Sequence, residues 1–313
     1  MGRRARGGVI ANGIIPLNKP GGITSMDVVR AVKRLTGVRR VGHAGTLDPI
    51  ATGVLPVCLG QGTRLMERLV DGGKRYRGEV TLGSATDTYD AAGQQTVTGS
   101  FAHVTREQVE AALAPYHGTV LQRPPMYSAL KHEGQRLYEL ARAGVEVERE
   151  PREVVVHAIT LEAFAPPVLR IEVRCGRGFY MRTLAHELGE ALGVPAHLSA
   201  LERTEAGPFA LAQTVMLEDL EASGEAWREH LLPPDAAVDE VQAATVEPAA
   251  ERHLRNGQPV SLPSAGVYAG HLEERRAYSV DGRFIALVRF NRMESLWHPE
   301  KVFDLPEPSP LAP

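Results

Sequence analysis

One stretch of the chain changes its hydrophobic period from two to nearly four, and this change constrains the fold more than any other feature. In residues 168–193, VLRIEVRCGRGFYMRTLAHELGEALG, Ile171, Val173 and Cys175 alternate with charged residues, as in a strand buried on one face. Two glycines then predict a turn. The apolar stripe of a helix follows at Leu184, Leu188, Ala191 and Leu192. The chain therefore combines strands and helices in one domain.

The charge at the start of that predicted helix is unusual. Arg182 falls in its first turn, where the helix dipole is positive and a cation is unfavourable. A cation is tolerated there when an anionic group lies beside it. The sequence therefore predicts an anion in contact with Arg182.

A second constrained segment, GHAGTLDPIATG at residues 42–53, holds one carboxylate between glycines and a proline. Because Pro49 follows Asp48, the α conformation is disfavoured at Asp48, and its side chain stands on a loop. Such a carboxylate either acts as a nucleophile or caps its own loop in an Asx turn. The residues themselves leave both interpretations open.

The strand predicted at KRYRGEVTLG, residues 74–83, raises a similar question about Tyr76. Tyr76 alternates in step with Gly78, Val80 and Leu82 along the strand, so its side chain faces the same buried side of the sheet. It is either a core residue whose hydroxyl is hydrogen-bonded or the wall of a site.

Two more helices follow from end signals. Ser25 is a plausible N-cap for a helix that ends at Gly37, and Thr105 begins a helix that runs to about Leu113.

The C-terminal part of the chain is expected to be rich in strands. Asp281-Gly282 between two apolar runs predicts a β-hairpin. The segment LLPPDAAVDEV, residues 231–241, reads as a linker or bordering segment. The Pro-rich residues 305–313 are expected to be disordered.

Charge is unevenly distributed, although the net charge is only −3. Residues 1–40 carry nine basic side chains and one acidic one, whereas residues 216–250 carry nine acidic side chains and one basic one. This segregation favours a strongly positive face that fits a nucleic-acid partner, although solvated helix faces give the same pattern.

The two cysteines, Cys58 and Cys175, lie far apart in apolar or strand-like settings, which fits a reducing cytoplasm better than a disulfide framework or a cysteine zinc site. No apolar run is long enough to span a bilayer, and no secretory leader is evident. HELGE at His186 lacks the second histidine of a zinc-protease helix, so no metal is expected there.

The sequence resembles the bacterial tRNA pseudouridine synthases of the TruB type nearly end to end. Six motifs carry the resemblance: LNKPGGITS (17–25), VGHAGTLDPIATGVLPVCLG (41–60), KRYRGEVTLGSATDTYDAAG (74–93), QRPPMYSALKHEGQRLYELARAG (122–144), CGRGFYMRTLAHELG (175–189) and HLSALERTEAGPF (197–209). The family implies an α+β fold with a mixed, mainly antiparallel central sheet flanked by helices, followed by a small β-rich PUA-like domain. The expected divisions are a catalytic domain at 8–243 with an RNA-contacting insertion at 122–150, the PUA-like domain at 244–304, and the tail.

The resemblance also implies an activity: isomerisation of a uridine in the T-loop of tRNA, at position 55, to pseudouridine. Asp48 would be the nucleophile, and Arg182 would pair with it. Tyr76 resembles the aromatic residue that stacks on the target base and is placed to help remove the C5 proton. The isomerisation needs no redox change and no added group, so no cofactor is expected. Attack on the ring, attack on the sugar and removal of a ribose proton all remain open.

Four further residues resemble substrate-binding positions of the family. Leu201 would close the pocket over the uracil, and His43 would stack into the loop when the base is flipped out. Tyr180 and Lys19 would support the site. Without the family, Lys19 reads as a solvated surface lysine, Tyr180 and Leu201 as core residues, and His43 as a residue that stabilises the loop.

The partner implied is the T-arm of tRNA, read by shape and phosphate contacts, with no membrane and no obligate protein partner, and with the chain a monomer. Expected contact surfaces are the basic N-terminal helix, the insertion, Arg64, Arg68, Lys74 and Arg75. Glu202 and Glu205 stand where many relatives carry positive charge, which weakens the case for RNA contacts there. Two alternatives are a guide-RNA-dependent synthase and a tRNA-binding folding chaperone with secondary catalysis.

Overall fold

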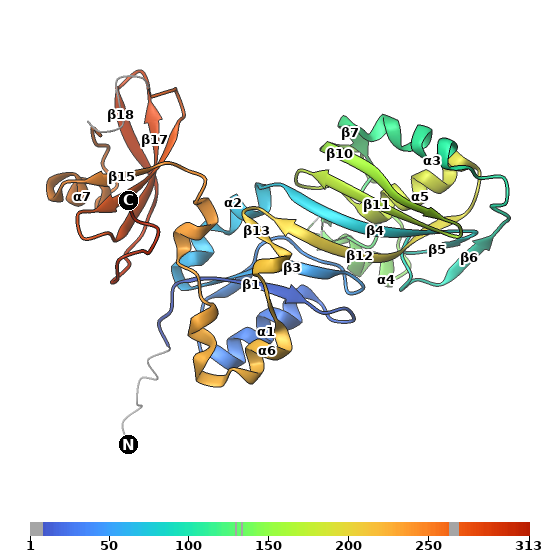
Figure 1. Cartoon of the computed structure of the whole chain (residues 1–313), viewed down its shortest axis with the longest axis horizontal. Coiled ribbons are helices and arrows are strands. Elements are labelled where there is room, and N and C mark those ends of the chain that lie inside the picture. The colour runs from blue at the N-terminus through green and yellow to red at the C-terminus, as the bar shows by residue number, and fades with distance from the viewer. Residues whose placement is uncertain (1–8, 129, 133, 263–268) are drawn as a thin grey trace.

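The computed structural model describes residues 9–128, 130–132, 134–262 and 269–313. They form an elongated body with a smaller β domain at one end (Figure 1). Ten described strands of the body form one sheet in the order β14-β1-β3-β12-β4-β11-β10-β7, with β2 paired to β3 and β13 paired to β12. The strands are β1 (Gly13–Lys19), β2 (Val41–His43), β3 (Thr52–Leu59), β4 (Lys74–Leu82), β7 (Gly118–Gln122), β10 (Arg152–Ala165), β11 (Val168–Cys175), β12 (Ala196–Ala206), β13 (Phe209–Ala210) and β14 (Val215–Met216).

The pairing of these strands confirms the expected mixed, mainly antiparallel sheet. Among the strands described, β1 pairs in parallel with β14 and β3 in parallel with β12, and the other neighbours are antiparallel. The β3–β12 pairing joins two halves of the chain that are far apart in sequence. It puts Gly53 opposite Arg203, close to the loop that carries Asp48.

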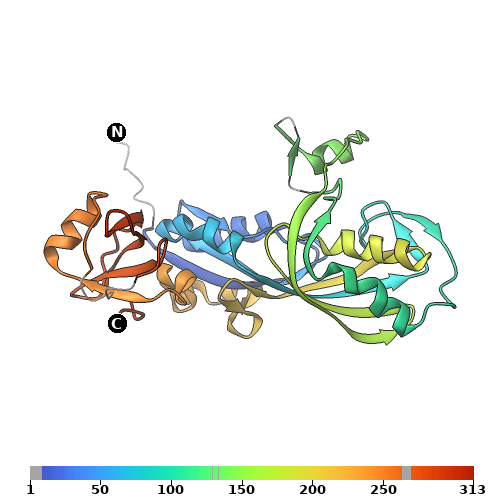
Figure 2. The same cartoon turned by 90° about the horizontal axis from the view of Figure 1, so that it is seen from above.

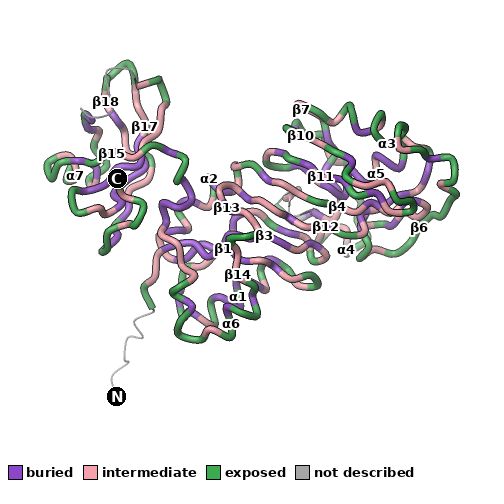
Figure 3. The backbone as a smooth tube through the Cα atoms, viewed as in Figure 1, coloured by how far each residue is buried: buried purple, intermediate pink, exposed green. Residues whose placement is uncertain are grey.

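Helices cover the sheet at both ends of the body (Figure 1). They are α1 (Ser25–Thr36) and α6 (Leu217–Ala222) near β1, and α3 (Arg106–Leu113) and α5 (Met181–Leu192) near the far end. The apolar faces of α1 and α5 join the sheet in the main core, to which Val32 and Leu188 contribute fully buried side chains. Buried residues follow the central strands, and exposed residues dominate the outer loops (Figure 3).

The change of period at residues 168–193 folds as expected. β11 ends at Cys175, a turn follows in which Gly178 has a φ of 88°, and α5 begins at Met181. A positive φ is accessible to glycine at little cost, so the chain can reverse here within five residues. Arg182 therefore lies in the first turn of α5, as predicted.

The start of α1 differs from the prediction by one residue. Thr24, not Ser25, is the N-cap: its side chain accepts from the Asp27 amide, and the Asp27 side chain closes the capping box. Ser25 is released for another contact. Its hydroxyl donates to the Leu47 carbonyl and accepts from the Leu47 amide, which ties α1 to the loop that holds Asp48. Gly37 ends the helix, as predicted.

Two hairpins extend from the body. β5 (Ser84–Thr86) and β6 (Gln95–Thr98) pair around a turn that carries Asp90. Between β7 and β10, the insertion forms β8 (Lys131–His132), β9 (Gln135–Arg136) and α4 (Leu137–Arg142), and it projects away from the sheet (Figure 2). Because Gln122 pairs with Arg152, the two ends of the insertion meet at its root.

The C-terminal domain is a four-stranded sheet in the order β15-β16-β17-β18, with α7 (Pro248–Arg255) against it. Its strands are β15 (Ala243–Val246), β16 (Glu274–Ser279), β17 (Phe284–Asn291) and β18 (Leu296–Val302). The predicted hairpin at Asp281-Gly282 joins β16 to β17, which confirms that prediction. The domain is small and rich in strands, as expected.

Of the two interpretations of the junction, the structure favours a bordering segment over a linker. Residues 231–241 are not an exposed linker, because Ala236, Ala237 and Val238 are buried in a core shared with the C-terminal domain. The tail at 305–313 differs from its prediction, since Leu305 is buried and the Ser309 hydroxyl donates to Asp235 at 2.6 Å. Composition predicts disorder, but a Pro-rich segment becomes ordered when a buried acceptor and an apolar surface are available.

Candidate active site

The predicted anion beside Arg182 is Asp48. The guanidinium Nε lies 2.9 Å from one carboxylate oxygen of Asp48, and Nη2 donates to the other oxygen at 3.0 Å. The Nη2 contact is a hydrogen bond and the Nε contact is an ion pair without hydrogen-bond geometry, and together they hold the carboxylate beside the guanidinium. The side chain of Arg182 is only 4% exposed, whereas that of Asp48 keeps 32% exposure, so the carboxylate remains accessible.

A second carboxylate, Asp90, lies near the same guanidinium, 3.6 Å from Nε. Its other oxygen accepts from the Thr88 hydroxyl at 2.6 Å and the Ala92 amide at 3.0 Å. Asp90 is therefore occupied in organising its own turn. Arg182 also donates to the carbonyl of Tyr127 at 2.7 Å, at the root of the insertion.

Burial raises the pKa of Asp48 above its ordinary value, and the Arg182 guanidinium acts against that shift. The nearby Asp90 carboxylate raises the pKa of Asp48 further, and Lys19 lowers it. The site thus places the Asp48 carboxylate in a partly desolvated position in direct contact with the Arg182 guanidinium. A carboxylate is one of the side chains that can act as a nucleophile in a covalent mechanism.

Lys19 holds the Asp48 loop through backbone carbonyls. Its side chain is fully buried, and its ammonium donates to the carbonyls of Pro20 at 2.7 Å, Ile23 at 2.8 Å and Pro49 at 3.4 Å. Burial lowers the pKa of Lys19 to about 8. The interpretation of Lys19 as a solvated surface residue is therefore wrong, and its position beside the site agrees with the family-based expectation.

Arg203 holds the same loop, although its residue type and motif alone did not mark it as part of the site. This fully buried side chain on β12 donates to the carbonyls of Val54 at 2.7 Å and Gly45 at 2.9 Å, which flank Asp48 in sequence. The sequence did contain one signal. Arg203 lies two residues after Leu201 in the same strand, so both side chains face the same buried side of the sheet. A basic residue at a core position of a strand needs acceptors, and the loop carbonyls are those acceptors.

A cavity of about 290 Å³ opens in front of Asp48 and Arg182. Tyr76, Tyr180 and Leu201 line it together with the ion pair, so five of the seven residues predicted for the site come together. Leu201 is 7% exposed, and burial raises the pKa of both Tyr76 and Tyr180. The other walls are largely apolar and aromatic, which suits a flat ring, and Lys74, Arg177 and Arg203 add positive charge beside the ion pair.

The other two predicted residues do not line this cavity. Lys19 is bonded to the loop that carries Asp48, and His43 is the last residue of β2, opposite Val57. His43 is partly exposed, burial lowers the pKa of its imidazole, and its Nδ1 is buried without a hydrogen-bond partner in the described residues.

The predicted basic contact surface is only partly available. Lys74 is buried and donates to backbone carbonyls, including that of Gly72 at 2.6 Å, and Arg75 pairs with Glu172 and Glu205. Arg68 pairs with Glu274 and Glu240, across the junction to the C-terminal domain. The ammonium of Lys74 is thus occupied by backbone carbonyls, and the charges of Arg68 and Arg75 are already paired within the protein.

Arg64 differs from these three. It lines a groove of about 710 Å³ between α2 (Met66–Asp71) and β18, together with Arg40, Arg177 and Lys301. Arg177 is paired with Asp71 and Glu300 with Arg289, so Arg40, Arg64 and Lys301 face the one carboxylate of Glu67 in this groove. The excess of positive charge suits a polyanion.

In the part of the chain that the structure describes, no His, Cys, Asp and Glu side chains gather in threes or more to hold a metal ion. The same residues include no helix with the length and apolar character to cross a membrane. Cys58 and Cys175 are both buried and unpaired.

Comparison with known proteins agrees with this geometry. Residues 33–181 match the family described as TruB family pseudouridylate synthase (N terminal domain), and residues 182–239 match the tRNA pseudouridylate synthase B C-terminal domain. A relative from Dehalococcoides mccartyi named tRNA pseudouridine synthase B is 44% identical over 95% of this chain and 98% of its own length. One of the same name from Symbiobacterium thermophilum is 51% identical over 79% of this chain and 82% of its own.

Solved structures share the fold. The protein in a structure described as a Cbf5-Nop10-Gar1 complex is 27% identical, with a TM-score of 0.71 over 93% of this chain and 85% of that one. The similarity therefore covers the motifs, the sheet and the C-terminal domain, and not just one element. The chain therefore belongs to the TruB family of pseudouridylate synthases.

Proposed function

We propose that this pseudouridine synthase acts on tRNA and converts the T-loop uridine at position 55 to pseudouridine. The relatives that carry the name tRNA pseudouridine synthase B support tRNA as the substrate. The observation that carries the chemistry is the Asp48–Arg182 ion pair in a cavity with aromatic and apolar walls.

In the proposed reaction, the bond between N1 of uracil and C1′ of the ribose breaks, and a bond between C5 and C1′ forms. The C5 proton leaves and N1 gains one, so the product is an isomer and nothing is oxidised or reduced. Asp48 is the nucleophile that splits this rearrangement into two easier steps. Attack on the ring and attack on the sugar both use the carboxylate as nucleophile, whereas in a glycal route the same carboxylate would be the base that removes a ribose proton.

The other residues around the cavity have supporting roles. Tyr76 stacks on the uracil and helps remove the C5 proton, while Leu201 and Tyr180 close the pocket around the ring. Arg182 keeps Asp48 ionised and oriented, and Lys19 holds the loop. His43 fills the space that the uridine leaves when it flips out, which offsets part of the few kcal/mol lost in unstacking.

Binding of the folded T-arm rests on shape and phosphate contacts. The groove lined by Arg40, Arg64, Arg177 and Lys301 supports this proposal. So does the projecting insertion, whose root contacts Arg182 through Tyr127. The protein is further proposed to act as a cytoplasmic monomer without an obligate protein partner or cofactor.

The proposal is tested by mapping pseudouridine base by base in T-arm RNA treated with the purified protein. Asp48→Asn should abolish the product and keep RNA affinity within about tenfold, since shape and phosphates carry binding. Asp304→Asn, at a side chain with 97% exposure, is the matched control and should behave as wild type. Product from Asp48→Asn in a single-turnover assay would show that another group is the nucleophile.

The same assay separates the alternatives. A protein with this fold was solved in a Cbf5-Nop10-Gar1 complex, which keeps the guide-RNA-dependent, partner-dependent synthase as a rival. Activity of the purified chain on bare T-arm RNA rules out that dependence. If Asp48→Asn rescues a strain that lacks the enzyme, binding alone suffices in the cell, and the folding-chaperone role is the important one.

A further inference from the structure

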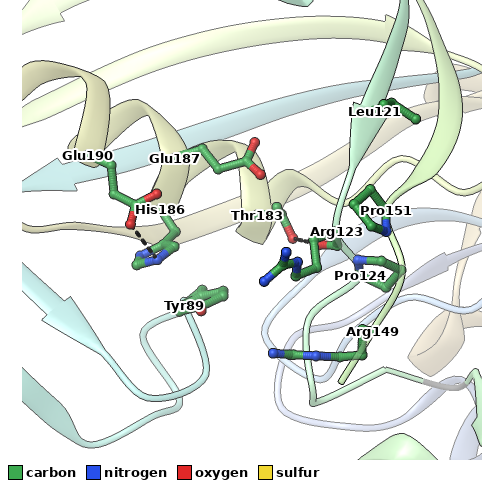
Figure 4. A pocket seen from close by; sticks show the side chains of 10 residues that line it. All are labelled: Tyr89, Leu121, Arg123, Pro124, Arg149, Pro151, Thr183, His186, Glu187 and Glu190. Carbon is green, nitrogen blue, oxygen red and sulfur yellow. Dashed lines mark hydrogen bonds and ion pairs between the residues drawn. The ribbon is translucent and has the colours of Figure 1, made fainter. Parts of the chain in front are cut away.

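An aromatic pair next to the active site takes no part in the chemistry proposed for Asp48. The ring of Tyr89, in the turn after β5, is stacked on the ring of His186 from α5, with centroids 3.9 Å apart and planes within 8° of parallel (Figure 4). Neither residue lines the cavity in front of Asp48. Any effect of the pair on the reaction therefore passes through the residues that it holds in place.

The stack joins this turn to α5 at a point one helical turn away from Arg182. Residues 182 and 186 are four apart on α5, so their side chains lie on the same face of the helix. The turn meets this face at two places. Tyr89 packs on His186, while Thr88 and Asp90 lie beside the guanidinium of Arg182. Three consecutive residues of the turn thus contact one face of α5.

The contacts at Arg182 are too long to hold the turn by themselves. Arg182 Nη1 is 3.5 Å from the Thr88 carbonyl oxygen, and Nε is 3.6 Å from the Asp90 carboxylate. The short contacts of the same guanidinium go elsewhere, to Asp48 at 2.9 Å and to the Tyr127 carbonyl at 2.7 Å. Because hydrogen bonds weaken steeply at such lengths, the position of the turn relative to Arg182 must be set by other contacts.

Some of these contacts come from β12. The Leu198 amide donates to the Tyr89 carbonyl at 3.0 Å, and the Leu198 carbonyl accepts from the Ala91 amide at 2.9 Å. These two bonds fix the backbone of the turn against the sheet. The stack of Tyr89 on His186 supplies the matching contact on the side of the helix.

The backbone of Tyr89 is strained, and apolar burial does not explain why. Its φ is 63°, a left-handed conformation that is uncommon for a bulky residue. Both rings are only partly buried, and the His186 side chain keeps 28% exposure. The stack therefore removes less apolar area from water than a core pair would. Backbone strain of this kind persists where the position of a side chain is needed for function.

We propose that Tyr89 and His186 are positioning residues of the synthase. Their stack fixes the turn against α5, which keeps Asp90 beside Arg182 and limits the guanidinium to the orientation that holds Asp48. Neither ring touches the substrate. The inference rests on the proposed role of Asp48 and deepens it, because it names what orients the partner of the nucleophile.

The test measures the single-turnover rate at saturating T-arm RNA and the equilibrium Kd for the same RNA. Tyr89→Ala and His186→Ala should each lower the rate about 10- to 100-fold, the cost of a small misplacement of a catalytic group, and leave Kd within about twofold. The double variant should be no slower than the slower single variant, because each change removes the same contact. Tyr89→Phe and His186→Phe keep a ring at each position and should restore the rate.

Two further variants separate position from charge and from stability. Glu190→Gln removes the carboxylate that lies 3.6 Å from His186 and keeps the ring pair, so its rate should equal that of the wild type. Tyr89→Gly removes the ring, and glycine adopts the left-handed backbone at little cost. The urea midpoint of Tyr89→Gly should therefore be no lower than that of Tyr89→Ala, while its rate should be equally low.

A second cycle asks whether the pair acts through Arg182. Arg182→Lys keeps a positive charge but lacks the planar fork of the guanidinium. In that background Tyr89→Ala should lower the rate by less than about threefold, because no fork remains to be oriented. A loss as large as in the wild-type background would overturn the inference.

Two other results would overturn it as well. An increase in Kd at an unchanged rate would mean that the ring pair contacts RNA, and a rate that follows the urea midpoint across the variants would mean that the pair only stabilises the fold. Both failures leave the proposed function standing when the wild type forms pseudouridine at the expected position and Asp48→Asn does not. A wild type inactive on T-arm RNA, or an active Asp48→Asn, would remove the proposed function and the inference with it.

Discussion

At the scale of single residues, the site depends on how one guanidinium is shared. Arg182 contacts Asp48 at 2.9 Å and Asp90 at 3.6 Å, while both carboxylates are in a poorly solvated place. The other oxygen of Asp90 is bonded to its own turn, so only Asp48 presents an oxygen to the cavity. The Asp90 carboxylate raises the pKa of Asp48, and this coupling is open to measurement.

The pH profile of Asp90→Asn tests the coupling. The pKa of Asp48 is raised in the folded protein, in part by Asp90, so the ionised fraction of Asp48 falls as the pH drops through that raised value. Asparagine removes the neighbouring charge and keeps an oxygen for the turn. The pKa of Asp48 should fall, and the acid limb of the single-turnover rate should move to lower pH.

Asp87→Asn is the matched control, since Asp87 lies in the same turn and accepts from the Gln94 amide, but is not among the groups that shift Asp48. Its acid limb should coincide with that of the wild type. An acid limb that moves to higher pH in Asp90→Asn, or not at all, would contradict the coupling.

At the scale of elements, the Asp48 loop is fixed by strands on both sides of it. Gly53 at the start of β3 has a φ of 101°, and a Cβ there would lie 2.2 Å from the Arg203 carbonyl oxygen. The close approach of β3 and β12 thus requires glycine at this position, and it brings Arg203 within reach of the loop carbonyls. The loop is held by the same contact that closes the sheet.

Gly53→Ala should therefore impair stability and activity together. The left-handed backbone costs an alanine on the order of 1–3 kcal/mol, and separating the strands adds a comparable overpacking cost of about 1–3 kcal/mol. We expect a lower midpoint in urea unfolding and a slower single-turnover rate.

Gly118→Ala separates the two effects. Gly118 begins β7 with a φ of 93° and has open space around its Cβ position, so only the backbone cost applies. The Gly118→Ala variant should lose less stability than Gly53→Ala and should keep the single-turnover rate of the wild type. Equal losses in both variants would mean that the β3–β12 approach does not constrain the loop.

At the scale of the whole molecule, the two domains share a core. Ile14 and Val54 of the body pack in one cluster with Tyr278, Phe284 and Phe303 of the C-terminal part. A buried polar network lies beside it: the hydroxyl of Tyr278 donates to Asp235 at 2.6 Å and accepts from Arg276 at 3.0 Å. Burial and the Asp235 carboxylate raise the pKa of Tyr278, so its hydroxyl stays protonated and available as a donor.

Because the core crosses the junction, the two domains should unfold in one cooperative transition. Phe303 is fully buried and stacks on Phe284 at 4.6 Å between centroids. Phe303→Ala should cost about 3–5 kcal/mol of the free energy of unfolding and lower a single calorimetric peak. Met293→Ala, at a residue with 95% exposure, should change it by less than about 0.5 kcal/mol. Two separate peaks in the wild type would contradict a shared core.

The sequence by itself determined the local elements and much of the candidate site. The change of period at 168–193 predicted β11, the turn and α5, and the placement of Arg182 against a helix dipole predicted an anion beside it. These inferences succeed because strand parity, helix periodicity and the dipole act over a few residues. The motifs named Asp48, Tyr76, Tyr180 and Leu201, which line one cavity in the structure. Their catalytic and binding roles remain predictions.

Only the tertiary structure decided which charges are free and which are already bonded. Lys19, Lys74 and Arg203 read as basic residues in sequence, yet each is buried and bonded to backbone carbonyls. The order of residues 305–313 was decided in the same way, by an acceptor on Asp235, seventy-four residues from Ser309. A buried polar group must find its partner wherever the fold supplies one, and that partner is set by strand pairing across the whole chain rather than by neighbours in sequence.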